Sequence, residues 1–229
     1  RSSSRASRSG AVPEHDDLIA SIRNYDNPWK VPRAKKAKWS EGLGLMPEGD
    51  VLYFAGCSTS LLSQETGRKM VSLLRTIGVE PAYLGKAERC CGSVARKVGE
   101  DKLAREKAEA CFSDFAEAGA KTVLTSCPGC ASALNHYEDI PKARGIEVLH
   151  ISQYLDRRLD DIDLRKKDMK GTVTYHDPCD LGRELGVYDA PRRVLAAAVK
   201  SPVVEMERSR ERSSCCGSGA GVRSAFPGL

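Results

Sequence analysis

The sequence lacks long apolar runs: no stretch approaches the roughly 18 consecutive apolar residues that a membrane-spanning helix needs. It also shows no leader in which a basic start precedes an apolar centre. Aromatic residues make up only 6% of the chain, but an apolar fraction of 41% is enough for a buried core. We therefore expect a soluble, cytoplasmic protein of one large or two small domains, without a membrane span of its own. Docking to the inner face of the cell membrane through a partner stays open.

The chain also lacks the dense, even cysteine content of small secreted domains. Nine cysteines in 229 residues are an odd number at modest density, which disfavours a disulfide framework. Paired C-x-x-C zinc knuckles are absent. So is the C-x-x-C-x-x-C-x-x-x-C-P run of ferredoxins. The sequence therefore has no motif for a ferredoxin-type 4Fe-4S centre.

Eight of the cysteines follow one order twice. A single cysteine is followed by 32 residues, a vicinal pair, 35 residues and a C-P-G-C; later a single cysteine is followed by 35 residues and a second pair. Both pairs continue as Cys-Cys-Gly-Ser. The first set is Cys57, Cys90, Cys91, Cys127 and Cys130, and the second is Cys179, Cys215 and Cys216.

A vicinal cysteine pair is poorly suited to an internal disulfide. Such a bond needs Cα atoms roughly 4.4–6.8 Å apart, whereas consecutive Cα atoms lie about 3.8 Å apart. The repeated pairs therefore indicate metal ligands. Zinc closes its shell at four ligands, fewer than the five cysteines of the first set. Iron–sulfur clusters use thiolates at several irons, so we favour them; a zinc-stabilised interaction module remains an alternative.

The cysteine order, with three local strings, resembles the CCG domain of the heterodisulfide reductase catalytic subunit. The strings are RNYDNPW at residues 23–29, SCPGC at 126–130 and HDPCDLGR at 176–183. The membrane-bound form of that enzyme and a subunit of the sulfite-reduction membrane complex are similar. The likeness runs from about residue 20 to the end of the sequence.

This resemblance implies a noncubane 4Fe-4S cluster held by all five cysteines of the first set. It also implies that a disulfide is cleaved between two such clusters. The second set has Cys179, Cys215 and Cys216, but only 13 residues follow Cys216, too few to reach a matching C-x-x-C. The chain thus looks like a fragment, or a subunit whose missing ligands come from elsewhere. A second iron–sulfur cluster at this incomplete motif is possible in either case.

Alternating apolar runs and helical periodicities predict an α/β fold with a mainly parallel sheet. We expect two similar Rossmann-like lobes from an internal repeat with an offset of about 120 residues, the second lobe incomplete. The cysteines follow predicted strands, so they should meet at one sheet edge. The expected strands are 51–56, 79–84, 121–126, 172–176 and 203–206, and the helices 63–77, 101–118 and 191–199. The expected parts are an N-terminal arm or linker at 1–50, with residues 1–12 disordered, a first lobe at 51–165 and a truncated second lobe at 166–229.

Several single features also need an interpretation. The basic stretch between Trp29 and Trp39 is read as a solvated connector whose tryptophans pack on a neighbour, and no nucleic-acid partner is expected. Cys111, inside a predicted helix, is read as a buried structural thiol. His176 is the candidate catalytic residue, as a proton donor to a leaving thiolate; its alternative role is a hydrogen bond to the next loop.

Taken as a sequence, the chain favours an iron–sulfur oxidoreductase subunit of the heterodisulfide reductase type. Its substrate would be a heterodisulfide-like molecule or a protein-borne persulfide or trisulfide. The expected partner is an electron-donating iron–sulfur, flavin or membrane cytochrome subunit. One alternative is an electron-transfer subunit of a lactate or glycolate oxidase-type complex, in which the cluster binds no substrate. The other is the zinc module.

Overall fold

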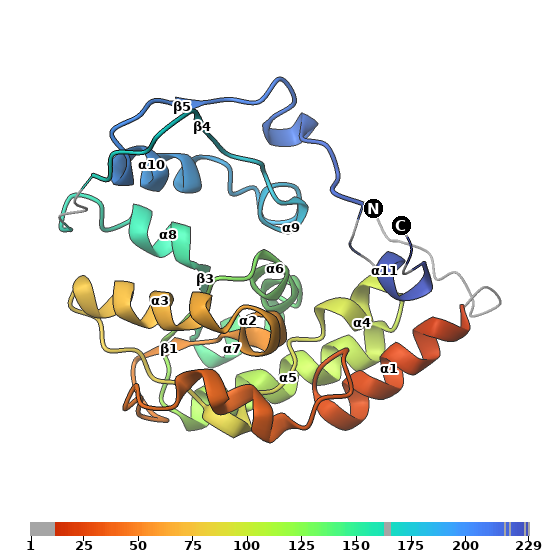
Figure 1. Ribbon diagram of the computed structural model, residues 1–229. Helices are drawn as coiled ribbons and strands as arrows, with labels where there is room; N and C mark the ends of the chain where they lie inside the picture. Colours follow the sequence, from red (N-terminus) through yellow and green to blue (C-terminus); the bar gives the residue numbers. More distant parts are fainter. Residues whose placement is uncertain (1–11, 163–165, 218, 220, 227, 229) are drawn as a thin grey trace.

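Short apolar segments of the chain pair as parallel strands. β1 (Val51–Tyr53), β2 (Thr122–Thr125) and β3 (Glu147–His150) form one sheet in the order β1-β2-β3. The computed structural model describes residues 12–162, 166–217, 219, 221–226 and 228 (Figure 1). Residues 1–11 of the segment expected to be disordered, and the predicted lobe boundary at residue 165, lie outside the described residues.

Side chains alternate between the two faces of this sheet, and each face has its own core. Leu52 and Val123 belong to the apolar cluster on one face, whereas Tyr53 and Leu124 belong to the cluster on the other. Helices contribute to both clusters, so the fold is α/β, as predicted. The covering helices are α5 (Asp101–Glu117), α6 (Pro128–His136) and α7 (Asp139–Arg144) on the first face, and α3 (Gln64–Thr76) and α8 (Ile151–Asp156) on the second.

The predicted strand at 79–84 shortens to a single parallel bridge. Leu52 pairs with Ala82, whose N–H donates to the carbonyl of Val51 at 2.8 Å. The carbonyl of Ala82 also accepts the N–H of Tyr53 at 2.8 Å, whereas the N–H of Tyr83 points away from β1 and donates to the carbonyl of Met46. Leu84, the next residue that could pair with β1, already has helical dihedral angles as the N-cap of η2, so the ladder ends there. Strand β3 was not predicted. The predicted helices agree with the structure to within two residues at either end.

The chain after residue 166 forms a smaller unit. β4 (Val173–Thr174) and β5 (Val203–Val204) pair in parallel, and α10 (Asp189–Ala198) packs against α8 (Figure 1). These strands are shorter than the predicted ones, and the internal duplication stays a prediction. The remaining elements are α2 (Gly56–Leu62), η2 (Gly85–Ala87), α4 (Ser93–Lys97), α9 (Cys179–Gly182), η3 (Arg210–Arg212) and α11 (Val222–Ala225).

The N-terminal segment is part of the folded body. Helix α1 (Pro13–Tyr25) buries Ile22 in a cluster that also contains Cys90, and the 3-10 helix η1 (Arg33–Ser40) buries Trp39. The Trp39 indole N–H donates to the Tyr83 hydroxyl at 2.9 Å. Trp39 therefore packs as the sequence led us to expect, whereas Trp29 is 40% exposed. The solvated part of that interpretation is wrong for Lys36, which is completely buried.

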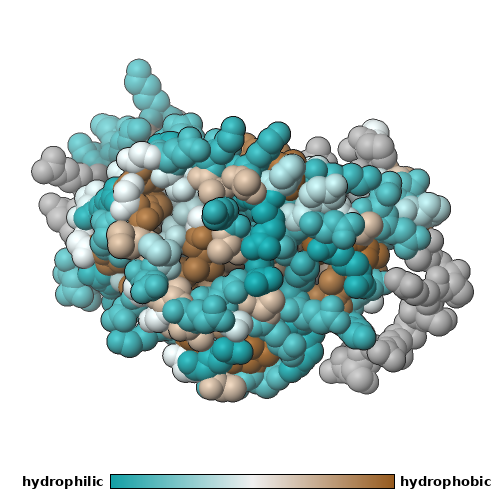
Figure 2. All heavy atoms as spheres, turned by 90° about the horizontal axis from the view of Figure 1, so that it is seen from below, coloured by the Kyte–Doolittle hydropathy of each residue, from teal (hydrophilic) through white to brown (hydrophobic). Residues whose placement is uncertain are grey.

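The outer surface shows no single large apolar face in the view from below. Hydrophilic residues cover most of it, and hydrophobic residues gather in small separate patches (Figure 2). Among the residues that the structure describes, none of the helices combines the length and the apolar character needed to span a membrane.

His150, at the end of β3, caps helix α8. Its Nδ1 accepts the N–H of Ser152 at 3.3 Å, and its own N–H donates to Gln153 Oε1 at 3.0 Å, which completes a capping box. Burial lowers the pKa of His150 to about 4. The unfolded chain, in which histidine titrates near 6.5, therefore binds this proton more readily than the folded chain does.

We predict that this histidine makes the fold less stable at mildly acidic pH. Between pH 7 and pH 5 the free energy of unfolding should fall by about 2 kcal/mol on its account. The variant His150→Asn keeps a capping acceptor but cannot titrate, so its loss should be smaller by that amount. Urea unfolding of the metal-free chain at both pH values measures the difference. Equal losses in the two proteins would contradict the assignment.

Candidate metal centre

The first five cysteines come together at one edge of the main sheet. Cys57 follows β1 and lies in the first turn of α2, and Cys127 follows β2 and is the N-cap of α6. Because β1 and β2 are parallel, their carboxyl ends lie side by side, as the sequence led us to expect. Cys90 and Cys91 enter this edge on the segment between η2 and α4, and Cys130 enters it from α6.

The five thiols form a continuous line of contacts. The Sγ atoms of Cys91 and Cys130 lie 3.4 Å apart. Cys57 and Cys90, Cys90 and Cys91, and Cys130 and Cys127 are close enough that each thiol shifts the pKa of its neighbour. All nine cysteines are free thiols. The contacts therefore join the cysteines in the order 57, 90, 91, 130 and 127.

Burial and mutual hydrogen bonding separate the acidities of these thiols. Hydrogen bonds with Cys57 and Cys91 hold the pKa of Cys90 well below its usual value. A hydrogen bond to Cys90, together with burial, raises the pKa of Cys57. At the other end of the line, the hydrogen bond from Cys130 lowers the pKa of Cys127 to about 6. The site thus favours the thiolate, the form that binds metals, at Cys90 and Cys127, whereas the pKa values of Cys57, Cys91 and Cys130 are raised.

Close approach of the backbone makes room for this line. Gly56 has a φ of +71°, and a Cβ at this position would lie 2.8 Å from the Sγ of Cys130. No side chain fits between the start of α2 and that thiol, and L-residues avoid this φ. Glycine is therefore required next to Cys57 if Cys130 is to remain in the line.

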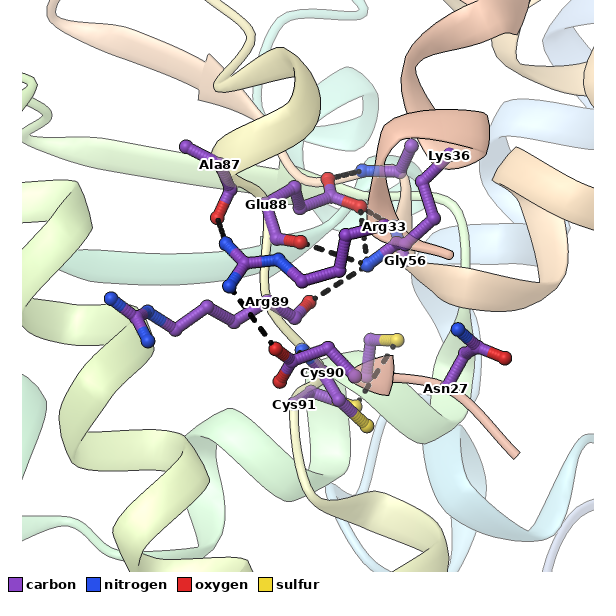
Figure 3. A network of polar contacts seen from close by, with 12 residues as sticks. Asn27, Arg33, Lys36, Gly56, Ala87, Glu88, Arg89, Cys90 and Cys91 are labelled. Atoms are coloured by element: carbon purple, nitrogen blue, oxygen red, sulfur yellow. Dashed lines mark hydrogen bonds and ion pairs between the residues drawn. The ribbon is translucent and has the colours of Figure 1, made fainter. Parts of the chain in front are cut away.

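Residues outside the cysteine motif hold the thiol-bearing segments, and sequence reasoning missed them. Asp26 Oδ1 accepts the N–H of Cys90 at 3.3 Å and the ammonium of Lys107 at 2.7 Å. Lys36 and Glu88 form a fully buried ion pair beside Cys90 (Figure 3). Asp26 belongs to the string at 23–29, which could have signalled it. Lys36 stands among exposed lysines and carried no signal.

The second cysteine set is more open than the first. Cys179 and Cys215, and Cys215 and Cys216, are close enough that each shifts the pKa of its neighbour. Cys179 is partly buried, whereas both members of the pair are exposed. Arg183 Nη1 lies 3.8 Å from the Sγ of Cys179. The structure therefore brings these three thiols together, but at the surface.

The two cysteine sets are neighbours in space. Helix α9, which begins at Cys179, packs on α6, which carries Cys130. Asp180 Oδ2 accepts from Lys97 Nζ at 2.6 Å and lies on the Cys127 side of α6. A second ion pair, between Arg96 and Glu184 at 3.2 Å, ties α4 to the same region. The partly exposed Cys127 end of the line therefore faces the second set.

His176 and Cys111 are placed by clear contacts. His176 is exposed, and its Nε2 lies 3.0 Å from the carbonyl oxygen of Ser214. Its suggested proton-donor role stays a prediction. Cys111 is 1% exposed within α5 and donates to the carbonyl of Cys90 at 3.4 Å. The reading of Cys111 as a buried structural thiol agrees with this position.

The donor set fits an iron–sulfur group in its chemistry. Five soft thiolate donors, joined by contacts along a line, exceed what one zinc ion uses. Among the described side chains, no three of the His, Cys, Asp and Glu residues already surround a single-ion site. A multi-iron cluster can instead take ligands spread over several metal atoms.

Comparison with known proteins gives a consistent family. The model of the CCG cysteine-rich domain matches residues 51–135 and 173–227. The chain is 34% identical, over 91% of its length, to a subunit of the dihydromethanophenazine:CoB--CoM heterodisulfide reductase of Methanosarcina barkeri, and it covers 53% of that subunit. It is 37% identical, over 87% of its length, to the EtfAB:quinone oxidoreductase of Syntrophomonas wolfei, of which it covers 29%.

A third relative is a subunit of the fumarate reductase (CoM/CoB) of Methanothermobacter marburgensis. It is 35% identical over 82% of this chain, which covers 36% of that protein. The chain thus spans about half the length of the heterodisulfide reductase subunits that it matches, and less of the other two relatives. By their names, these relatives are oxidoreductases or their subunits.

We predict that the line of thiols, and not Cys111, binds iron. Cys90→Ser or Cys91→Ser should each remove most of the iron bound at the first set, because each replaces a thiolate in the middle of the line. Cys111→Ser, the matched control for a buried thiol in the same core, should leave the iron content unchanged. Iron and sulfide analysis after anaerobic reconstitution measures this. Loss of iron in Cys111→Ser with full retention in Cys91→Ser would refute the ligand set.

Proposed function

We propose, because the chain belongs to the CCG cysteine-rich family, that it is an iron–sulfur oxidoreductase subunit that reduces a disulfide. The observation that carries this proposal is the continuous line of five thiols at the carboxyl edge of the sheet. The name of the heterodisulfide reductase relatives supports the disulfide as substrate class. A heterodisulfide-like molecule and a protein-borne persulfide or trisulfide are the candidate substrates.

Under this proposal Cys57, Cys90, Cys91, Cys127 and Cys130 would hold a noncubane 4Fe-4S cluster, which supplies single electrons and an iron that is open to sulfur. The chain's own residues shield and orient the site. Cys90, Cys91 and Cys130 are buried, which excludes water from the middle of the line, whereas both ends, Cys57 and Cys127, are partly exposed. Of these two ends, Cys127 lies next to the second cysteine set, so a substrate between the sets would approach from the Cys127 side.

Reduction of one disulfide to two thiols consumes two electrons and two protons. Cys179, Cys215 and Cys216 would hold a second iron–sulfur cluster, with further ligands from outside this sequence, and so provide the second electron. His176, whose Nε2 lies 3.0 Å from the carbonyl oxygen of Ser214 next to Cys215, would donate a proton to the departing thiolate. An iron–sulfur, flavin or membrane cytochrome subunit would deliver the electrons.

A second candidate function is electron relay without a substrate at the cluster. The names of the EtfAB:quinone oxidoreductase and fumarate reductase relatives favour it, since neither names a disulfide as the substrate of the reaction. In this case the first cluster would have no iron open to sulfur. A zinc-stabilised interaction module, the remaining alternative, would contain one zinc in place of about four irons and matching sulfide.

We predict that a small disulfide changes the paramagnetic signal of the oxidised, reconstituted chain. A disulfide sulfur can bind only if iron is open to it, so a relay cluster would show the same spectrum with and without the disulfide. Electron paramagnetic resonance with a thioether of the same size as control measures the effect. An unchanged spectrum would favour the relay function, and zinc without iron would overturn both.

The second set should hold iron more weakly than the first. Three thiols, two of them exposed, provide fewer anchoring bonds and less shelter from chelators than five thiols of which three are buried and two partly buried. We expect a chelator to remove any iron at the second set quickly, and Cys179→Ser to abolish only this fast fraction. Stopped-flow chelation of wild type, Cys179→Ser and Cys57→Ser separates the two fractions. Loss of the slow fraction in Cys179→Ser would show that the sets are not independent.

A further inference from the structure

Lys36 is a lysine buried completely inside the protein. Its relative exposure is 0%, and no other lysine or arginine among the described residues belongs to the fully buried group. Its Nζ donates to the carbonyl oxygens of Glu88 and Arg89 at 3.0 and 3.1 Å, and lies 3.5 Å from Glu88 Oε1 (Figure 3). Lysine is rarely buried without a partner, because removing its charge from water is costly. Three oxygen partners offset that cost here.

Glu88 connects this lysine to the other thiol-bearing segment. Its carboxylate accepts the N–H of Ala55 at 2.8 Å and that of Gly56 at 3.1 Å, directly before Cys57. Lys36 holds the carbonyl groups directly before Cys90. One ion pair therefore binds both backbone segments from which the first thiols of the line project, and Lys36 reaches it from the N-terminal helix η1.

The positive end of this pair acts on the thiols. The ammonium of Lys36 lies 3.1 Å from the carbonyl oxygen of Arg89, directly before Cys90, so its charge is close to the first thiols of the line. The negative end of the pair is turned toward the amides of Ala55 and Gly56, which partly neutralise it. A buried positive charge favours whichever redox state nearby carries more negative charge.

We propose that Lys36 and Glu88 are a positioning pair that fixes Cys57 and Cys90, and that the Lys36 charge raises the reduction potential of the group these thiols hold. This inference rests on the proposed iron–sulfur function. The N-terminal segment, which lies outside the cysteine motif, would thus help to set the reduction potential of the site.

The test compares midpoint potentials of the reconstituted chain in a matched set of variants. The double variant K36M/E88Q removes both charges at nearly constant volume, and E88Q leaves the lysine charge without its counter-ion. K36R keeps the charge. K35M is the control, because Lys35 is the adjacent, exposed lysine of the same 3-10 helix. Spectroscopic redox titration gives the potential, and thermal unfolding with iron analysis reports on folding and retention.

At a fixed applied potential, we expect K36M/E88Q to shift the ratio of oxidised to reduced group at least tenfold toward the oxidised form. This corresponds to a midpoint potential that is lower by about 59 mV for one electron. E88Q should shift it in the opposite direction, and K36R and K35M should stay near wild type. If the double variant does not fold, E88Q and K36R decide the matter. Faster loss of iron from a folded double variant would support the positioning part.

The outcomes separate this inference from the proposed function. If the wild-type chain binds iron and sulfide, and both E88Q and K36M/E88Q have the same midpoint potential as wild type, the tuning role is overturned and the proposed function is left intact. An equal shift in K35M would mean that any surface charge has this effect, which also overturns it. A wild-type chain that binds no iron would overturn both proposals.

Discussion

The parallel pairing of β1 with β2 is the constraint on which the site depends. Tyr53 lies opposite Leu124, so the chain leaves both strands at the same edge, and Cys57 and Cys127 follow there within a few residues. A parallel pair needs a long crossover between its strands. This crossover carries Cys90 and Cys91 back to the same edge, next to Cys130. The cysteine spacing is therefore the spacing of a strand-helix-strand unit, and the thiols meet because the backbone topology brings them together.

The cost of gathering five thiols shapes the surroundings of the site. Like thiolates in a buried line repel one another, and burial disfavours each charged form. Interactions between neighbouring thiols lower the pKa values of Cys90 and Cys127, which favours their thiolate forms. The pKa of Cys130 is raised, so this thiol stays protonated beside them. The buried ammonium of Lys36, paired with Glu88, adds a positive charge that is opposite in sign to the thiolates. The N-terminal segment is thus coupled to the site by charge as well as by apolar packing of Ile22 and Trp39.

Sequence patterns predicted those features that depend on local periodicity. The helices at 64–76 and 101–117 show apolar spacing that burial in the core requires, and the convergence of the cysteines followed from strand order. Strand β3 was missed, although it is as long as the predicted strand β2. The strand at 79–84 was overestimated because Leu84 already has the helical dihedral angles of the turn that follows. The role of Lys36 could not be read from sequence. Its neighbours Lys35 and Lys38 are not buried with it, and its partner Glu88 lies 52 residues away.

The two cysteine sets differ in burial and in how firmly the surrounding residues hold them. The first set is fixed by Asp26, Lys36 and Glu88 within a dense core, whereas the second lies at the surface. The two are nevertheless joined by ion pairs, one from Lys97 to Asp180 and one from Arg96 to Glu184. Lys97 and Arg96 end helix α4, which starts two residues after Cys91. One short helix therefore links the vicinal pair of the first set to the region of α9, where Cys179 begins the second set, and the two sets are held on the same side of the molecule by charged contacts as well as by the packing of α9 on α6.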